Sequence, residues 1–180
     1  MYRMNQIIRK PLSDTDLKTI LGSETRIITY PELAKYNSLD ELLPKQYDFV
    51  IILLLETPQS GHWCALLRYS SQFEWFDSYG FKVDYDLSHW LTPLQRLKLG
   101  ESQKYLSSLL QGRNYIYNNV KHQQVKPNIN TCGSHVAYRC HKFKTAGFNL
   151  KDYQQHVYNY CRAYGLTPDQ LVAQFVSSML

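Results

Sequence analysis

The chain has 180 residues, of which 44% are hydrophobic, and a formal net charge of +5. A chain of this length can bury most of its apolar surface in one core, so we expect a single domain that spans residues 1–180. The longest apolar run, Phe49 to Leu55, is far shorter than the ~20 residues that cross a bilayer, and the start lacks the apolar stretch of a secretory signal, so neither a membrane partner nor export is expected. The basic residues are dispersed along the chain, which allows weak DNA binding without requiring it.

The cysteines indicate a reducing compartment. They do not form closely spaced pairs, and the chain shows no export signal, so we expect free thiols inside the cell. The four are Cys64, Cys132, Cys140 and Cys161.

The first half of the chain predicts two short helices and then a run of strands. Ser13 and its acidic neighbours are typical of a helix start, so a helix is expected up to Gly22 and a second over residues 38–43. Residues 47–56 are rich in Val, Ile and Leu, which predicts a strand buried on both faces. The next two strands are expected at residues 62–67 and 72–78.

The second half is mainly helical. Residues 88–111 have a helical pattern, with Thr92-Pro93 as its start and Gly112 as its stop. A strand is expected over residues 114–120, followed by a polar loop. Three helices follow, at residues 132–146, at residues 149–164 and after the capping box Thr167-Pro168-Asp169-Gln170. Strands grouped between helices predict an α+β fold with a central, mostly antiparallel sheet.

Cys132 stands where the polar loop meets a predicted helix, with Asn130 or Thr131 as the helix cap. Backbone N–H groups and the helix dipole at such a position favour a thiolate, which is the nucleophilic form of cysteine. Inert buried cysteines are common, so the position by itself is only suggestive. Cys132 is the candidate nucleophile on this basis.

A predicted hairpin brings a histidine to a carboxylate. A four-residue loop, Arg68 to Ser71, would set Leu67 opposite Gln72, and a regular ladder from there sets His62 opposite Asp77. At that spacing the carboxylate can accept from the imidazole Nδ1 and leave Nε2 for a thiol. A register slip of one residue would send the carboxylate to the other face. The expected arrangement is a triad of nucleophile, base and orienting group.

Other assignments compete for the same residues. His135 lies three residues after Cys132 on the same helix, so it could be a second base or could bond a backbone carbonyl. Cys64 shares a strand face with His62, but its apolar neighbours favour a core thiol. A structural zinc site is disfavoured because no C-x-x-C pair is present. Its ligands would be Cys132, His135, Cys140 and His141.

Four short motifs follow one another between residues 61 and 139. They are Gly61-His62-Trp63, then Trp75-Phe76-Asp77-Ser78-Tyr79-Gly80, then a glutamine, then Thr131-Cys132-Gly133-Ser134-His135-Val136-Ala137. Their order of His, Asp, Gln and Cys resembles that of the adenain-like cysteine proteases. This group includes the adenovirus maturation protease, related proteases of giant viruses and virophages, and the cellular proteases that process SUMO and similar modifiers.

The resemblance implies a papain-like α+β arrangement and a role for each matching residue. Cys132 would be the nucleophile, His62 the base and Asp77 the group that orients it. Gln124 would hold the oxyanion together with the backbone N–H of the nucleophile. The family's glutamine usually lies closer to the cysteine, and Gln123 is a rival for the same role.

The resemblance also implies a substrate and partners. Trp63 would line the substrate cleft. We expect a monomeric endopeptidase, located in the virion and in the infected cell, that cleaves capsid or other virion precursor proteins near glycine or small residues. No cofactor is required, although DNA or a peptide activates some relatives. Two alternatives remain, namely an isopeptidase that removes SUMO or ubiquitin and a non-catalytic virion protein that retains the fold.

Overall fold

The computed structural model describes residues 2–180, which form two compact units. The sheet unit comprises Arg26–Asp77 and Phe81–Asn119. The helical unit comprises the residues up to Thr25, Ser78–Gly80 and Val120–Leu180. The single-domain assignment remains a prediction.

The sheet unit contains a five-stranded sheet in the order β1-β2-β3-β4-β5. Its strands are β1 (Arg26–Thr29), β2 (Phe49–Thr57), β3 (Ser60–Arg68), β4 (Phe73–Phe76) and β5 (Tyr115–Tyr117). The two central pairings, β2 with β3 and β3 with β4, are antiparallel, whereas both outer pairings are parallel. Antiparallel ladders hold most of the paired residues, as predicted, and the two outer pairings add short parallel ladders. The short strand β1 was not predicted. Strand β5 runs parallel to β4, and this direction is possible because a long helical connection separates the two strands.

Short helices accompany the sheet within this unit. They are the 3-10 helix η1 (Tyr30–Lys35) and the α-helices α3 (Leu39–Leu42), α4 (Asp86–His89), α5 (Pro93–Leu99) and α6 (Tyr105–Leu109). The single helix predicted over residues 88–111 is thus three separate helices. A capping box between Thr92 and Gln95 starts α5, and Gly100 ends it in the left-handed conformation at φ 77°. A glycine adopts this conformation without the steric penalty of a Cβ atom.

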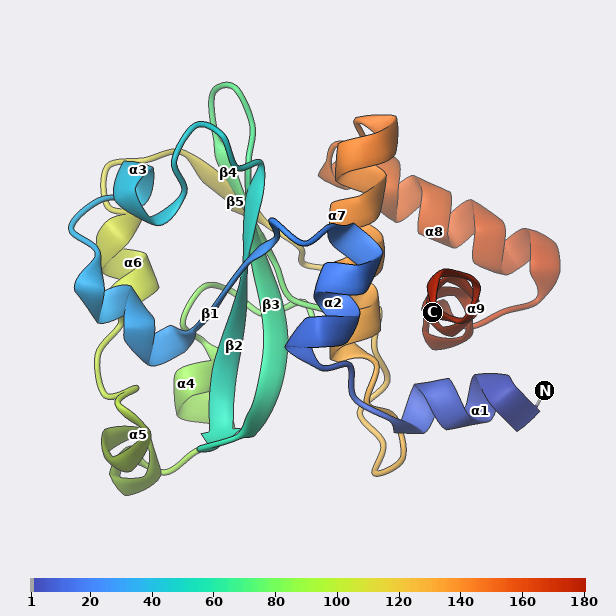
Figure 1. Ribbon diagram of the computed structural model, residues 1–180, viewed down its shortest axis with the longest axis horizontal. Coiled ribbons are helices and arrows are strands. Elements are labelled where there is room, and N and C mark those ends of the chain that lie inside the picture. Colours follow the sequence, from blue (N-terminus) through green and yellow to red (C-terminus); the bar gives the residue numbers. More distant parts are fainter. Residues whose placement is uncertain (1) are drawn as a thin grey trace. The chain divides into compact units, whose positions relative to one another are not determined.

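The core of the sheet unit lies between the sheet and these helices. Figure 1 shows η1, α3, α4 and α6 on the same side of the sheet. Side chains that alternate along the strands meet leucines of the helices there, and every member of this cluster is at most 9% exposed. Its largest strand residue, Trp75, is 1% exposed. This packing of a sheet against helices confirms the predicted α+β class.

The helical unit is built around one long buried helix. Its members are α1 (Tyr2–Arg9), α2 (Asp14–Leu21), α7 (Cys132–Ala146), α8 (Leu150–Tyr164) and α9 (Pro168–Met179). Helix α7 packs on α2 and α9, while α1 and α8 also pack on α9 (Figure 1). Every residue of α7 from Cys132 to Cys140 is buried. Helix α7 starts and ends as predicted, and Gly147 closes it in the left-handed conformation. No helix among residues 2–180 is long and apolar enough to cross a membrane.

A buried carboxyl group braces strand β2 against the segment between α5 and α6. Glu101 is 1% exposed, and its Oε1 accepts a hydrogen bond of 2.6 Å from the backbone N–H of Leu55. Burial raises the pKa of Glu101 to about 7, although the Leu55 N–H and Arg96 oppose this shift. Ionisation of Glu101 near neutral pH therefore places a charge in an apolar environment.

Glu101→Gln is expected to remove a pH dependence of stability. The folded-state pKa of about 7 lies above the ordinary value of 4.5, so the contribution of Glu101 is complete below about pH 4.5 and is lost as the pH rises towards 7. The free energy of unfolding of Glu101→Gln, measured relative to wild type by denaturant titration, should rise by about 3 kcal/mol between those pH values. Glu24→Gln, at an exposed position, is the control and should show no such rise. A parallel pH dependence in Glu101→Gln and wild type would contradict the assignment.

Candidate active site

The β3–β4 hairpin determines which side chains meet in the sheet unit. Its loop is Tyr69–Gln72, and the backbone N–H of Tyr69 donates to the carbonyl of Gln72 at 2.8 Å. The loop has the predicted four residues but begins one residue later. The ladder therefore pairs Ala65 with Phe76, so the predicted register is wrong by two residues. A shift of two preserves the side-chain alternation, so Asp77 stays on the face of His62.

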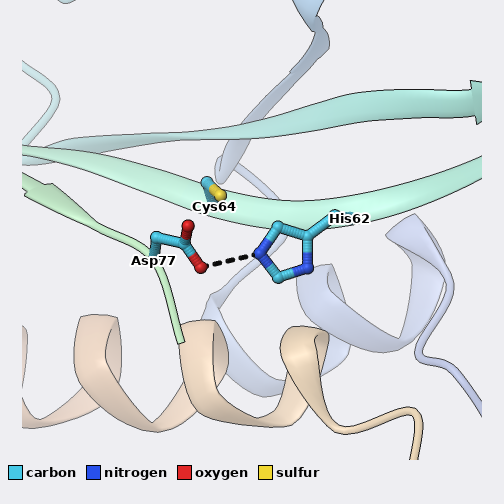
Figure 2. Close-up of side chains that lie close together, drawn as sticks. All are labelled: His62, Cys64 and Asp77. Carbon is cyan, nitrogen blue, oxygen red and sulfur yellow. Dashed lines mark hydrogen bonds and ion pairs between the residues drawn. The ribbon is translucent and has the colours of Figure 1, made fainter. Parts of the chain in front are cut away.

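His62 and Asp77 form a buried hydrogen-bonded pair. The Nε2 of His62 lies 2.8 Å from the Oδ1 of Asp77, and the two residues are 4% and 0% exposed (Figure 2). The backbone carbonyl of Asp77 accepts a 2.7 Å hydrogen bond from the Nδ2 of Asn118, which holds the segment after β4 in place. The carboxylate thus orients the imidazole ring, as the triad hypothesis requires.

The nitrogen that meets the carboxylate is not the predicted one. We predicted that Nδ1 would donate to Asp77, whereas Nε2 faces it. The register explains the exchange, because continuing the ladder by one residue places Cys64 opposite Asp77 and leaves His62 at a diagonal position. The ring must reach along the sheet, and its distal nitrogen makes the contact. Nδ1 is consequently the nitrogen that would serve a thiol.

Cys64 joins this pair. Its Sγ, one ring nitrogen of His62 and one carboxylate oxygen of Asp77 all lie within 4.8 Å of one another, and all three residues are buried (Figure 2). Cys64 also belongs to the hydrophobic core of the sheet unit, as predicted. Its position next to two polar residues was not predicted, because it follows from the shifted register.

Trp63, the predicted substrate-binding residue, is 7% exposed. It follows His62 along β3, so its side chain points to the opposite face of the sheet. Its role towards substrate remains a prediction.

In the helical unit, Cys132 is the first residue of α7 and is 7% exposed. Thr131 is the N-cap residue, but its side chain does not cap the helix. The first N–H groups of a helix lack partners within it, so the thiol stands at the positive end of a 15-residue helix. This is the environment predicted for the nucleophile. No cysteine among residues 2–180 forms a disulfide bond, and Cys140 is buried whereas Cys161 is partly buried.

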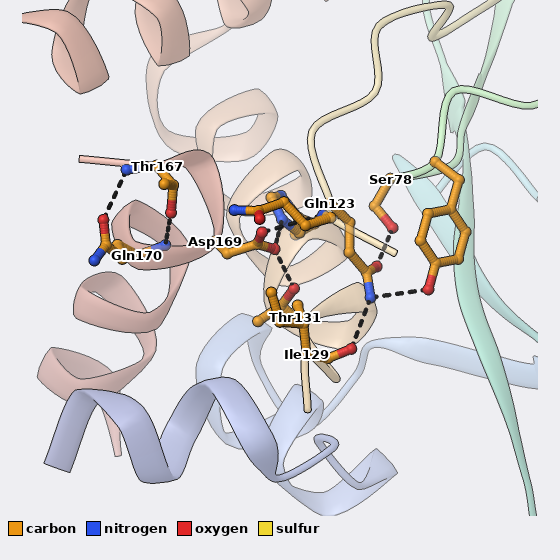
Figure 3. A network of polar contacts seen from close by, with 10 residues as sticks. Ser78, Gln123, Ile129, Thr131, Thr167, Asp169 and Gln170 are labelled. Carbon is orange, nitrogen blue, oxygen red and sulfur yellow. Dashed lines mark hydrogen bonds and ion pairs between the residues drawn. The ribbon is translucent and has the colours of Figure 1, made fainter. Parts of the chain in front are cut away.

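Asp169 ties the start of α7 to the loop before it. The hydroxyl of Thr131 donates to Oδ1 at 2.5 Å, and Nε2 of His135 lies 3.1 Å from the same oxygen. The backbone N–H of Gln124 donates to Oδ2 at 3.1 Å (Figure 3). Burial opposes ionisation of this carboxyl, but these donors outweigh it and hold the pKa of Asp169 below its usual range. The side chain therefore works as a buried anionic anchor.

His135 and His122 are part of this anchor. His135 was predicted to be a second base or to bond a backbone carbonyl, and its partner is the carboxylate of Asp169. His122 stacks on His135 with 6.1 Å between ring centroids. Burial, with a smaller contribution from His135, lowers the pKa of His122 to about 3, so His122 is neutral at physiological pH.

Sequence reasoning missed Asp169 as a site residue, because its helix start was fully explained by the capping box. Gln170, not Asp169, completes that box with Thr167 (Figure 3). Asp169 is also 1% exposed. One signal could have identified Asp169 from the sequence. It is an acidic residue at a helix start that the capping box does not use.

The two candidate oxyanion glutamines differ in their surroundings. Gln123 is 2% exposed, and its Oε1 accepts a 2.7 Å hydrogen bond from Ser78. Its Nε2 donates to the hydroxyl of Tyr79 at 3.1 Å and to the carbonyl of Ile129 at 3.4 Å. Both amide hydrogens of Gln123 are thereby used. Gln124 is partly exposed, and within the described chain its carboxamide has no hydrogen-bond partner.

Asp169→Ala is expected to destabilise the protein by about 3 kcal/mol, because it leaves buried donors without an acceptor. Since the pKa of Asp169 is lowered, its contribution is present above the usual aspartate range and is lost as the pH falls through it. Denaturant unfolding at neutral pH measures the loss. The control Asp152→Ala removes an exposed aspartate from the first turn of α8 and should have an effect below about 1 kcal/mol. Equal effects of the two substitutions would contradict the anchor assignment.

The sequence matches no protein-family model. It is 31% identical over 165 residues to the uncharacterized protein V9 of Sputnik virophage, covering 89% of this chain and 91% of that protein. Among solved structures, it resembles the SUMO protease Ulp1 with an oxidized catalytic cysteine, at 14% identity, 99% and 84% coverage and a TM-score of 0.44. The Ulp1 protease domain in complex with the yeast SUMO orthologue SMT3 gives 14% identity, 99% and 82% coverage and a TM-score of 0.40. The central domain of an uncharacterized Legionella pneumophila protein gives 12% identity, 96% and 100% coverage and a TM-score of 0.42. The virophage match covers most of both chains, and this protein belongs to the family of the Sputnik virophage protein.

Proposed function

We propose that this protein is a cysteine endopeptidase in which Cys132 is the nucleophile, His62 the base and Asp77 the group that orients the base. The observation that carries this proposal is the buried 2.8 Å hydrogen bond between His62 and Asp77. A histidine fixed by a carboxylate through one nitrogen presents its other nitrogen in a defined direction. The position of Cys132 at the start of α7 and the order of the sequence motifs support the same reading.

The reaction would proceed through an acyl enzyme. Nδ1 of His62 takes the thiol proton of Cys132, and the thiolate forms a C–S bond with the peptide carbonyl. The resulting oxyanion is held by the carboxamide of Gln124 and the backbone N–H of Cys132. The imidazolium gives its proton to the leaving amine as the C–N bond breaks. A water molecule, deprotonated by Nδ1, then releases the acid product and restores the thiol, while Asp77 accepts the Nε2 hydrogen throughout.

Selective alkylation tests the nucleophile and base. With sub-stoichiometric iodoacetamide near neutral pH, peptide mass mapping should show Cys132 modified at least tenfold faster than the other three thiols, because only an activated thiol is substantially ionised there. His62→Ala should remove this advantage. The control His89→Ala replaces an exposed histidine of the sheet unit and should retain it.

Two outcomes would contradict this assignment. One is that Cys132 reacts no faster than Cys64, Cys140 and Cys161, and this outcome would favour the non-catalytic virion protein. The other is an equal effect of His62→Ala and His89→Ala, which would leave the nucleophile without its proposed base.

Substitution of the two glutamines tests the oxyanion role. Gln124→Ala should lower kcat by about 10²-fold to 10³-fold and leave the alkylation rate of Cys132 unchanged, because alkylation forms no oxyanion. Gln123→Ala should instead lower the free energy of unfolding by about 1–3 kcal/mol, since the buried hydroxyl of Ser78 loses its acceptor. The reverse pattern would assign the oxyanion role to Gln123.

The natural substrate is proposed to be a capsid or other virion precursor cleaved near glycine or small residues. This chain belongs to the family of a virophage protein, which supports a viral context. The motif resemblance supports the cleavage preference. New protein termini should appear when wild type, but not Cys132→Ala, is incubated with denatured viral structural proteins.

Preferential cleavage of folded SUMO or ubiquitin conjugates would instead favour the isopeptidase. A salt-sensitive rise in rate on adding DNA would identify an activator.

A further inference from the structure

Three side chains that commonly bind metal ions converge in the sheet unit. We propose that His62, Cys64 and Asp77 form a binding site for Zn²⁺ or an ion of the same class. An ion bound to Nε2 of His62 would inhibit the enzyme, because the imidazole then carries its hydrogen on Nδ1 and cannot accept the thiol proton. The binding itself follows from the contacts of these residues. The inhibition rests on the function proposed above.

The spacing of the three groups suits a tetrahedral ion. Their ligand atoms all lie within 4.8 Å of one another, and Nε2 of His62 is 2.8 Å from Oδ1 of Asp77. Zinc bonds of about 2.0–2.1 Å to nitrogen or oxygen and about 2.3 Å to sulfur place these ligand atoms roughly 3.3–3.6 Å apart at tetrahedral angles. The histidine and carboxylate would separate by about 0.5 Å, and the sulfur would approach them by about 1.3 Å at most. Side-chain rotations of this size need no change in the sheet.

The chemistry of the donors selects the ion. A thiolate, an imidazole nitrogen and one carboxylate oxygen are ligands that zinc accepts together, whereas Mg²⁺ and Ca²⁺ prefer oxygen donors. Three protein ligands leave a fourth position for water. The three residues come from β3 and from the residue directly after β4, so the ladder between these strands fixes their spacing. The proposed reaction uses His62 and Asp77 but gives Cys64 no part. Metal binding would therefore be a separate role for this thiol.

The surroundings of the site are largely apolar. A pocket beside the imidazole is lined mainly by apolar side chains and by Glu56, whose exposed carboxylate would attract a cation. Cys64 and Asp77 are both 0% exposed, so a bound ion would be shielded from bulk solvent. Binding would release the thiol proton of Cys64 to solvent.

Cobalt titration tests the site directly, since Co²⁺ takes zinc positions and reports its ligands by absorption. Wild type and Cys132→Ser should each bind one Co²⁺ ion, with a thiolate-to-cobalt charge-transfer band and the visible bands of a tetrahedral complex. Cys140→Ser, which removes another buried thiol, should behave in the same way. Cys64→Ser and Cys64→Ala should lose the charge-transfer band and bind roughly 100-fold more weakly. Thermal unfolding verifies that each variant is folded.

Several outcomes would overturn the site. Loss of the band in Cys132→Ser with retention in Cys64→Ser would mean that the ion sits on the catalytic thiol. A band in both of these variants, or no band in wild type, would also contradict the proposal. If both Cys64 variants fail to fold, X-ray absorption at the zinc edge of Cys132→Ser decides the question. One sulfur and otherwise nitrogen or oxygen ligands are expected there, and an all-oxygen shell would refute the site.

The inhibition is measured separately from the binding. Zn²⁺ should suppress peptide hydrolysis by wild type, and the concentration for half inhibition should rise at least tenfold in Cys64→Ser, each protein being compared with its own rate without metal. Equal zinc sensitivity of the two proteins would overturn the inhibitory role. If no peptidase activity exists, the cobalt spectra still decide whether the metal site does, so the failure of one proposal is distinguishable from that of the other.

Discussion

The hydrogen bond between His62 and Asp77 is the interaction on which the proposed chemistry depends. Both side chains are almost completely buried, and an isolated carboxylate in such an environment would be destabilising by several kcal/mol. Pairing offsets this penalty only if the ring and the carboxylate meet at the correct distance. That distance is set by the hairpin register and by Asn118, which holds the backbone of Asp77. The loop of the hairpin therefore contributes to the site although none of its side chains enters it.

The helical unit stabilises a second buried carboxylate in a different way. Asp77 is hydrogen-bonded to one imidazole, whereas Asp169 accepts from a hydroxyl, a backbone N–H and an imidazole. In the first arrangement the carboxylate holds Nε2 of His62, and the proposed reaction uses the other ring nitrogen. The second distributes one charge over groups that belong to the start of α7 and to the loop before it. The pair at Asp77 is suited to chemistry, and the network at Asp169 is suited to holding Cys132 and Gln124 in place.

Much of this arrangement could be predicted from sequence, and the errors have identifiable causes. Helix α7 was placed correctly because a polar loop precedes Cys132 and a left-handed glycine ends the helix. His62 and Asp77 lie on the same face of the sheet, as predicted, although the predicted register was wrong. An error of two residues leaves the alternation of side chains between the two faces unchanged. The register itself depends on where the loop after β3 begins, and residue types do not reveal that hydrogen bond. Strand β1 was missed because four residues give too little alternation to detect.

The same register has a second consequence for the sheet unit. Had the ladder run as predicted, His62 would lie directly opposite Asp77, and Cys64 would be displaced along the strand. The observed ladder ends at the pair of Ala65 and Phe76, and its continuation by one residue would place Cys64 opposite Asp77 and His62 on the diagonal. A thiol, an imidazole and a carboxylate therefore converge. A proton and a metal ion can compete for a base positioned in this way. The lone pairs of the imidazole and the carboxylate, which hold protons in the proposed reaction, can also bind a metal ion. Alanine or serine at position 64 could fill the strand without this competition. The presence of a thiol there therefore makes the base that would activate Cys132 sensitive to metal.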